Sequence, residues 1–240
     1  MAQKYCKPNY FNTLLTDFIA LLYPEICIGC GNVLKQSEHL ICIACSLDMP
    51  RTYYEKHRNT PIEKLFWYKT DIHEATSAYF FTKKSRIQQM VHSFKYRGNK
   101  DAAFVLGEKM GIILKESPRF NQLDCIIPVP LHPKKMKIRG YNQAEILAQG
   151  VSSVLDIPLE LNTLKRKNHN NTQTNKGLFN RWTNVNSIFC IENPQKIANK
   201  HVLLIDDVIT SGSTIEACAQ QVLTVTNTKV SIATLAIATG

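Results

Sequence analysis

An uninterrupted apolar run that ends in two adjacent acids constrains the fold of this chain more than any other feature. Residues 202–205 read Val-Leu-Leu-Ile, and Asp206 and Asp207 follow directly, before a turn rich in hydroxyl groups at residues 210–214. A continuous apolar run is typical of a strand buried on both faces of a parallel sheet. Residues 215–225 then carry apolar side chains at helical spacing, so the pattern predicts a strand, a turn and a helix in succession.

The turn after this strand has the composition of a phosphate-binding site. Gly212 gives the backbone freedom to turn, and Ser213 or Thr214 can cap the helix, whose free N–H groups and positive dipole end then face outward. A nucleoside-triphosphatase loop would need a Lys after the glycines, and a dinucleotide fingerprint would need more glycines. Paired carboxylates beside a phosphate site suit a ribose 5-phosphate. The alternative is an ordinary strand–turn–helix whose acids are solvated.

Charge and length narrow the classes of partner and the number of domains. The 240 residues allow one sizeable core with a small appendage, or two small domains. The formal net charge of +10 favours an anionic partner, which is a phosphorylated small molecule, nucleic acid or a membrane surface. Residues 11–23 predict an amphipathic helix that is too short to span a bilayer and lacks a signal-peptide cleavage site. We therefore expect a cytoplasmic chain without a transmembrane segment.

Four of the eight cysteines have the spacing of a zinc site. They form two C-x2-C knuckles separated by eleven residues, and we expect them to bind one structural zinc ion through Cys27, Cys30, Cys42 and Cys45. A disulfide pair would need a secreted chain, and a redox pair would need a single C-x2-C in a βαβ unit. We expect residues 1–60 to hold the amino-terminal helix and the zinc module, and residues 61–240 to form the α/β domain.

A second strand tip lies at residues 124–130, where two prolines end an apolar run. A basic loop follows at residues 131–143, and the tip of a strand in an open α/β sheet is where such folds bind ligands. Within it, His132 is either a base or an ordinary surface histidine. Residues 95–97 end a predicted helix, and their basic side chains meet either an anion or the helix dipole.

The apolar run, acid pair and turn resemble the 5-phosphoribosyl-1-pyrophosphate (PRPP) motif of type I phosphoribosyltransferases. Five features together resemble the ComF/GntX family: the cysteine module, Phe-Lys-Tyr-Arg-Gly at residues 94–98, Pro-Val-Pro-Leu at residues 128–131, Arg-Gly-Tyr-Asn-Gln at residues 139–143, and the PRPP motif. Residues before the PRPP strand also fit, namely Arg166, Gln173, Arg181, Asn184 and Phe189. The resemblance implies a mostly parallel sheet flanked by helices, with a small amino-terminal zinc module. It also implies that residues 167–177 cover the active site.

The resemblance assigns roles to individual residues. It implies that Asp206 and Asp207 hold the ribose hydroxyls in catalysis. The 5′-phosphate would bind at Thr210, Ser211, Gly212, Ser213 and Thr214. The pyrophosphate, with Mg²⁺, would bind at Pro128, Val129, Pro130, Leu131, Lys134 and Arg139.

The family is linked to natural competence and DNA uptake. The resemblance therefore implies either a phosphoribosyltransferase of unknown acceptor, which is a pentosyl-transferring glycosyltransferase, or a non-catalytic factor that binds PRPP or single-stranded DNA. DNA-uptake proteins are the implied protein partners.

Overall fold

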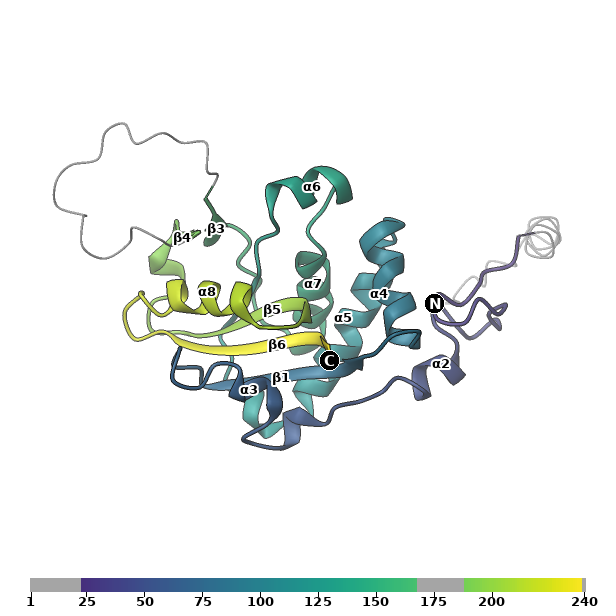
Figure 1. Cartoon of the computed structure of the whole chain (residues 1–240), viewed down its shortest axis with the longest axis horizontal. Helices are drawn as coiled ribbons and strands as arrows, with labels where there is room; N and C mark the ends of the chain where they lie inside the picture. The colour runs from purple at the N-terminus through teal and green to yellow at the C-terminus, as the bar shows by residue number, and fades with distance from the viewer. Residues whose placement is uncertain (1–22, 168–187, 239–240) are drawn as a thin grey trace, which may run out of the picture. The chain divides into compact units, whose positions relative to one another are not determined.

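The computed structural model describes residues 23–167 and 188–238, which form two compact units divided between Met49 and Pro50 (Figure 1). Residues 50–60, which we expected in the amino-terminal domain, group with the larger unit. The helix predicted at residues 11–23 lies outside the described residues except for Tyr23, and so does nearly all of the segment 167–177.

The smaller unit is built from tight turns around its cysteines. Antiparallel bridges join Ile26 to Val33 and His39 to Ile41. Helix α2 (Ile43–Leu47) follows, with Cys42 at its N-cap. A unit of this size has little apolar interior, so a cross-link between its turns is the expected source of its stability.

The core of the larger unit is a four-stranded parallel sheet. Its strands are β1 (Glu74–Phe81), β2 (Cys125–Pro128), β5 (His201–Ile209) and β6 (Lys229–Ala238), in the order β1-β6-β5-β2. Every pairing is parallel, and a single bridge from Ile126 to Leu159 extends the sheet beyond β2. The predicted buried strand is β5, whose first five residues are buried.

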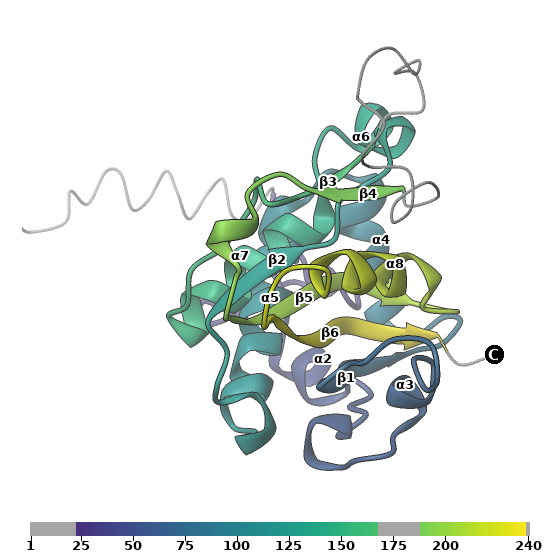
Figure 2. The same cartoon turned by 90° about the vertical axis from the view of Figure 1, so that its left-hand side faces the viewer.

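Helices cover both faces of this sheet (Figures 1 and 2). Helices α4 (Arg86–Tyr96), α5 (Lys100–Lys115) and α7 (Gln143–Leu155) pack on one face, while α3 (Pro61–Lys64) and α8 (Ser213–Val222) pack on the other. The expected fold class, a mostly parallel sheet flanked by helices, is confirmed. Short 3-10 turns at Tyr54–Lys56, Pro118–Phe120 and Pro194–Lys196 complete the unit.

Strand β4 (Phe189–Ile191) does not join the main sheet, because it pairs antiparallel with β3 (Leu164–Arg166) in a separate two-stranded sheet. The basic loop expected at residues 131–143 contains helix α6 (Pro133–Arg139). Proline is favoured in the first helical turn, and Gly140 ends the helix in the left-handed conformation at φ 77°.

Helices α5 and α7 approach each other closely because of paired glycines. A Cβ atom on Gly107 would lie 2.2 Å from the carbonyl oxygen of Leu147, and one on Gly150 would lie 2.2 Å from that of Phe104. No side chain fits at such a separation, so the glycines set the distance between the helices. This packing holds α7 against β2 and β5, whose carboxyl ends carry the site described below.

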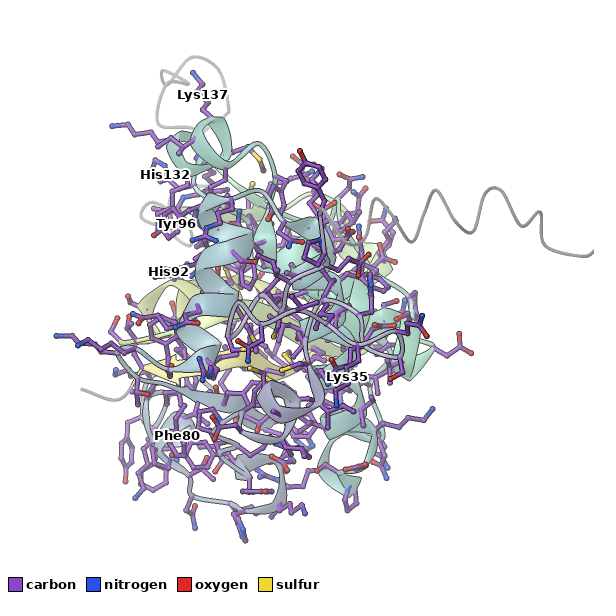
Figure 3. The ribbon with its side chains drawn as sticks, turned by 90° about the vertical axis from the view of Figure 1, so that its right-hand side faces the viewer. Lys35, Phe80, His92, Tyr96, His132 and Lys137 are labelled. Carbon is purple, nitrogen blue, oxygen red and sulfur yellow. The ribbon has the colours of Figure 1, made fainter. Side chains whose placement is uncertain are left out.

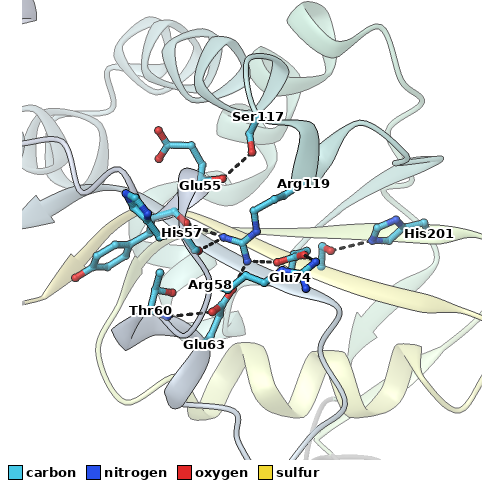
Figure 4. A network of polar contacts seen from close by, with 11 residues as sticks. Glu55, His57, Arg58, Thr60, Glu63, Glu74, Ser117, Arg119 and His201 are labelled. Carbon is cyan, nitrogen blue, oxygen red and sulfur yellow. Dashed lines mark hydrogen bonds and ion pairs between the residues drawn. The ribbon is translucent and has the colours of Figure 1, made fainter.

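A buried ion network fastens the segment before β1 to the amino-terminal edge of the sheet (Figure 4). The guanidinium of Arg119 bonds both Glu63 and Glu74, and it also donates to the carbonyl oxygens of Tyr54 and His57. Both glutamates and Arg119 are largely buried. Since a buried charge without a partner is costly, this network has a structural role.

No helix among the described residues is both long and apolar enough to cross a bilayer.

Candidate functional site

A polar cleft of about 350 Å³ opens at the carboxyl ends of β2 and β5. Parallel strands place these ends at one edge, which is where open α/β sheets bind ligands. Four cations and two carboxylates line the cleft, namely Lys95, Lys135, Arg139, Arg166, Asp206 and Asp207. The excess of positive charge suits a ligand with several phosphate groups, and the volume suits a small molecule.

The two acids at the tip of β5 lie in different environments. Lys95 of α4 donates to Asp207 at 2.8 Å, and both side chains are largely shielded from water. Asp206 accepts from the backbone N–H of Asp207 at 2.8 Å. Burial, followed by the neighbouring Asp207 carboxylate, raises the pKa of Asp206 to about 7. Ionising Asp206 in the ligand-free site therefore costs free energy, and hydrogen bonds from ligand hydroxyls would offset this cost.

The turn after the acids contributes Thr210 and Thr214 to the lining of the cleft. Helix α8 begins at Ser213, and Gly212 occupies the N-cap with φ 78°, a conformation that favours glycine. The expectation that Ser213 or Thr214 would cap this helix was wrong, because both lie in its first turn. The hydroxyl groups of Ser211 and Ser213 lie 3.1 Å apart. Free N–H groups and hydroxyls gathered at a helix start form an anion-binding site.

The segment Arg139–Gln143 holds the opposite wall of the cleft in place. The hydroxyl of Tyr141 donates to the carbonyl oxygen of Phe94 at the end of α4. Asn142 caps α7 and also donates to the carbonyl oxygen of Val129 at 3.0 Å, which ties the helix to the tip of β2. Gln143 accepts from Arg139 at 2.8 Å. The bonds of Tyr141 and Asn142 thus fix the start of α7 to α4 and to the tip of β2.

The structure brings most of the candidate phosphate-site residues together. Eight of them line the cleft, namely Val129, Pro130, Leu131, Arg139, Asp206, Asp207, Thr210 and Thr214. Ser211, Gly212 and Ser213 lie in the turn between Thr210 and Thr214, and Pro128 is buried within β2. Lys134 is exposed and is absent from the lining, where its neighbour Lys135 stands instead.

The sequence did not predict that Lys135 lines the cleft, and it left the roles of Lys95 and His132 open. Lys135 was missed because the segment was expected to be a loop, whereas on a helix successive side chains point about 100° apart. Lys95 lies 112 residues before Asp207, so only the fold shows their contact. His132 lines the cleft, and its Nδ1 accepts from the N–H of Lys134 at 3.1 Å. The family-pattern residues Gln173, Arg181 and Asn184 lie outside the described residues.

The four cysteines of the smaller unit converge as a metal site requires. Their sulfur atoms all lie within 4.8 Å of one another, and those of Cys30 and Cys42 are 3.8 Å apart. Tetrahedral zinc with bonds of about 2.3 Å to sulfur places its ligands about 3.8 Å apart. Although burial opposes it, N–H donors from Cys42 and Gly29 lower the pKa of Cys27 to about 6, while burial and the adjacent thiols raise the pKa of Cys45. The donor set fits a thiolate-binding cation such as zinc, which would let all four sulfur atoms ionise.

Comparison with known proteins agrees with this geometry. The family described as "Phosphoribosyl transferase domain" matches residues 142–239, which include the acids and the turn. The chain is 30% identical over 195 residues to "Competence protein F" of Haemophilus influenzae, covering 79% of this chain and 80% of the relative. It is 25% identical to "DNA utilization protein YhgH" of Salmonella typhimurium, covering 85% and 87%. It is also 25% identical to "Competence protein ComFC" of Bacillus subtilis, covering 91% and 87%.

These matches extend over most of the chain, and the domain match falls on the strand and turn that form the cleft. The chain therefore belongs to the ComF family of competence-linked proteins that contain a phosphoribosyltransferase-type domain.

Proposed function

We propose that the cleft binds PRPP with Mg²⁺ and that the chain transfers its phosphoribosyl group to an acceptor still to be identified. The observation that carries this proposal is the meeting of an acid pair, a phosphate-type turn and four cations in one cleft. PRPP is a ribose with a 5-phosphate and a 1-pyrophosphate. Its hydroxyls suit the acid pair, its 5-phosphate suits the turn, and its pyrophosphate suits the cations. The relatives named for competence and DNA utilization support a role in natural competence, exercised in the cytoplasm.

In this proposal the 5′-phosphate lies against residues 210–214, and the ribose hydroxyls donate to Asp206 and Asp207. The pyrophosphate lies along residues 129–131, near Lys135 and Arg139. An acceptor nucleophile attacks C1, the bond from C1 to the pyrophosphate oxygen breaks, and the acceptor's proton is released. Mg²⁺ bound to the pyrophosphate would neutralise part of its charge.

The protein's contribution to this reaction is position and charge. Cations fixed around the leaving group stabilise the charge that develops on it, and the carboxylates face the ribose as C1 becomes electron-poor. Lys95 holds Asp207 in place through their ion pair. The four-cysteine unit would contribute structure, with zinc held by thiolates on all four sides.

Calorimetric titration of the zinc-loaded protein with PRPP and Mg²⁺ tests the proposed binding. We expect saturable binding by the wild type, and its loss in the Asp206→Asn/Asp207→Asn variant with the fold intact by circular dichroism. Equal binding by both proteins, or none by the folded wild type, would refute the assignment of the ribose site.

Pyrophosphate release in the presence of candidate acceptors tests the transfer step separately. A transferase releases pyrophosphate only with the correct acceptor and loses this activity on Asp207→Asn. A protein that binds PRPP without releasing pyrophosphate with any acceptor would instead be a PRPP-binding competence factor.

A further inference from the structure

Ten of the 29 basic residues of this chain lie in two stretches of sequence that contain no acid. Residues 75–100 contain six Lys and Arg and no Asp or Glu, and residues 125–144 contain four Lys and Arg and no acid. The charge of these ten cations equals the formal net charge of +10 of the whole chain, which has 29 basic and 19 acidic residues. A charge placed in this way produces a field on one part of the surface.

The fold brings the two stretches together beside the cleft. Helix α4 comes from the first stretch and α6 from the second, and the guanidinium of Arg139 lies 5.7 Å from the ring centre of Tyr96. The ammonium group of Lys100 lies 5.3 Å from the ring of Tyr141. Figure 3 shows Lys137 of α6 and His132, the N-cap residue of α6, following Tyr96 and His92 of α4 along the same side of the unit. We name the exposed surface of α4 and α6 with these side chains the α4–α6 surface.

An exposed aromatic ring lies in the middle of this surface. Tyr96 is 69% exposed, and the ring of His92 meets it edge-on at 5.3 Å. In the described part of the chain, Arg97 and Lys137 are exposed and make no ion pair with a carboxylate. Aromatic rings among cations that follow a groove are the arrangement by which proteins bind single-stranded nucleic acid.

We propose that the α4–α6 surface binds a single strand of nucleic acid, with a base stacked on Tyr96 and phosphates contacting the surrounding cations. A single strand fits better than a duplex, because the faces of paired bases are already stacked and cannot reach an exposed ring. Lys95, Lys135 and Arg139 belong to the two acid-free stretches and also line the cleft. The bound strand therefore passes the mouth of the cleft.

Fluorescence anisotropy with a labelled oligothymidine of about 20 nucleotides tests this proposal on the full zinc-loaded chain. The test variant is Arg97→Glu/Lys137→Glu, and its control is Lys64→Glu/Lys69→Glu, which changes the charge equally. The control pair lies beside exposed Trp67 and Tyr68, a second place where cations and aromatic rings meet. We expect the test variant to weaken binding about tenfold or more, and the slope of log affinity against log salt to fall by about 1 to 1.5. The control should change the affinity less than about threefold.

Matched aromatic variants test the stacking step. We expect Tyr96→Ala to weaken binding about tenfold, Tyr96→Phe to retain it, and Tyr68→Ala to leave it unchanged. Circular dichroism of each variant confirms that it is folded before its affinity is compared.

Several outcomes would overturn the proposal. Equal losses in the two charge variants would show that net charge alone drives binding, and a larger loss in the control would place the strand near Trp67. Tighter binding of a duplex of equal length would exclude single-strand recognition. Binding to vesicles containing phosphatidylserine, with no binding to the oligonucleotide, would identify the surface as a membrane contact.

Discussion

Replacing Asp206 by Asn should stabilise the ligand-free protein at neutral and higher pH while removing its affinity for PRPP. Burial, and then repulsion from Asp207, raises the pKa of Asp206 from 3.8 to about 7. Since the folded state holds this proton more tightly than the unfolded state, the group contributes stability below about pH 4 that is lost as the pH rises through 7. Above that range the folded protein carries the full cost of an ionised, shielded carboxylate. Asn removes the charge and can still accept from the N–H of residue 207.

The magnitude follows from the size of this shift. About three pKa units correspond to an upper bound of roughly 4 kcal/mol, and the partial exposure of Asp206 reduces the expected gain to about 1–2 kcal/mol. A chain of this size should then unfold about 3–6 °C higher near pH 8. Below about pH 5 the difference should be small, because the wild-type residue is then protonated in the folded state.

Thermal unfolding followed by circular dichroism across this pH range measures the effect. The matched control is Asp207→Asn, which removes the partner of Lys95 and should give no gain. Destabilisation by Asp206→Asn near pH 8, or a gain of equal size near pH 5, would refute the reasoning that the ionised Asp206 carboxylate is costly in the folded protein.

Three further predictions concern the framework. Arg119→Ala should lower the free energy of unfolding by about 3–5 kcal/mol in urea titrations, because buried Glu63 and Glu74 lose the buried guanidinium that they share. Arg58→Ala should change the free energy of unfolding little, because the Arg58 side chain is 79% exposed. Equal effects of the two changes would contradict the role of the network. Gly150→Ala should cost at least about 2 kcal/mol in the same titration, because its Cβ would meet the carbonyl oxygen of Phe104, and unchanged stability would show that α5 and α7 can separate freely. Denaturing the purified protein should release one zinc ion per chain, which a zinc-sensitive dye detects. Cys45→Ser or acidification should weaken zinc binding, because the sulfur atoms that bind the ion must be thiolates. A purified chain with no zinc would contradict the metal site.

The parts of the fold that the sequence predicted well have strong local signals. The strand β5, the turn at Gly212 and the following helix are specified by consecutive residues whose burial and backbone geometry leave few alternatives. The cysteine knuckles are similar, because only a few spacings bring four sulfur atoms together. In each case the information lies within about 25 residues.

The missed features depend on contacts between distant segments or on very short elements. Strand β4 has three residues, and nothing in them distinguishes pairing with β3 from pairing within the main sheet. Helix α6 has only seven residues, although Pro133 and Gly140 mark its two ends and would have allowed its prediction. The partner of Asp207 could not be inferred because the fold alone brings α4 to the tip of β5.

The central claim, that the acid pair and the turn together hold a ribose 5-phosphate, is tested most directly by an electron-density map of crystals soaked with PRPP and Mg²⁺. We predict density for the 5′-phosphate against residues 210–214 and for the ribose hydroxyls within hydrogen-bond distance of Asp206 and Asp207. Density for the ligand elsewhere on the molecule, with this cleft filled only by water, would contradict the account.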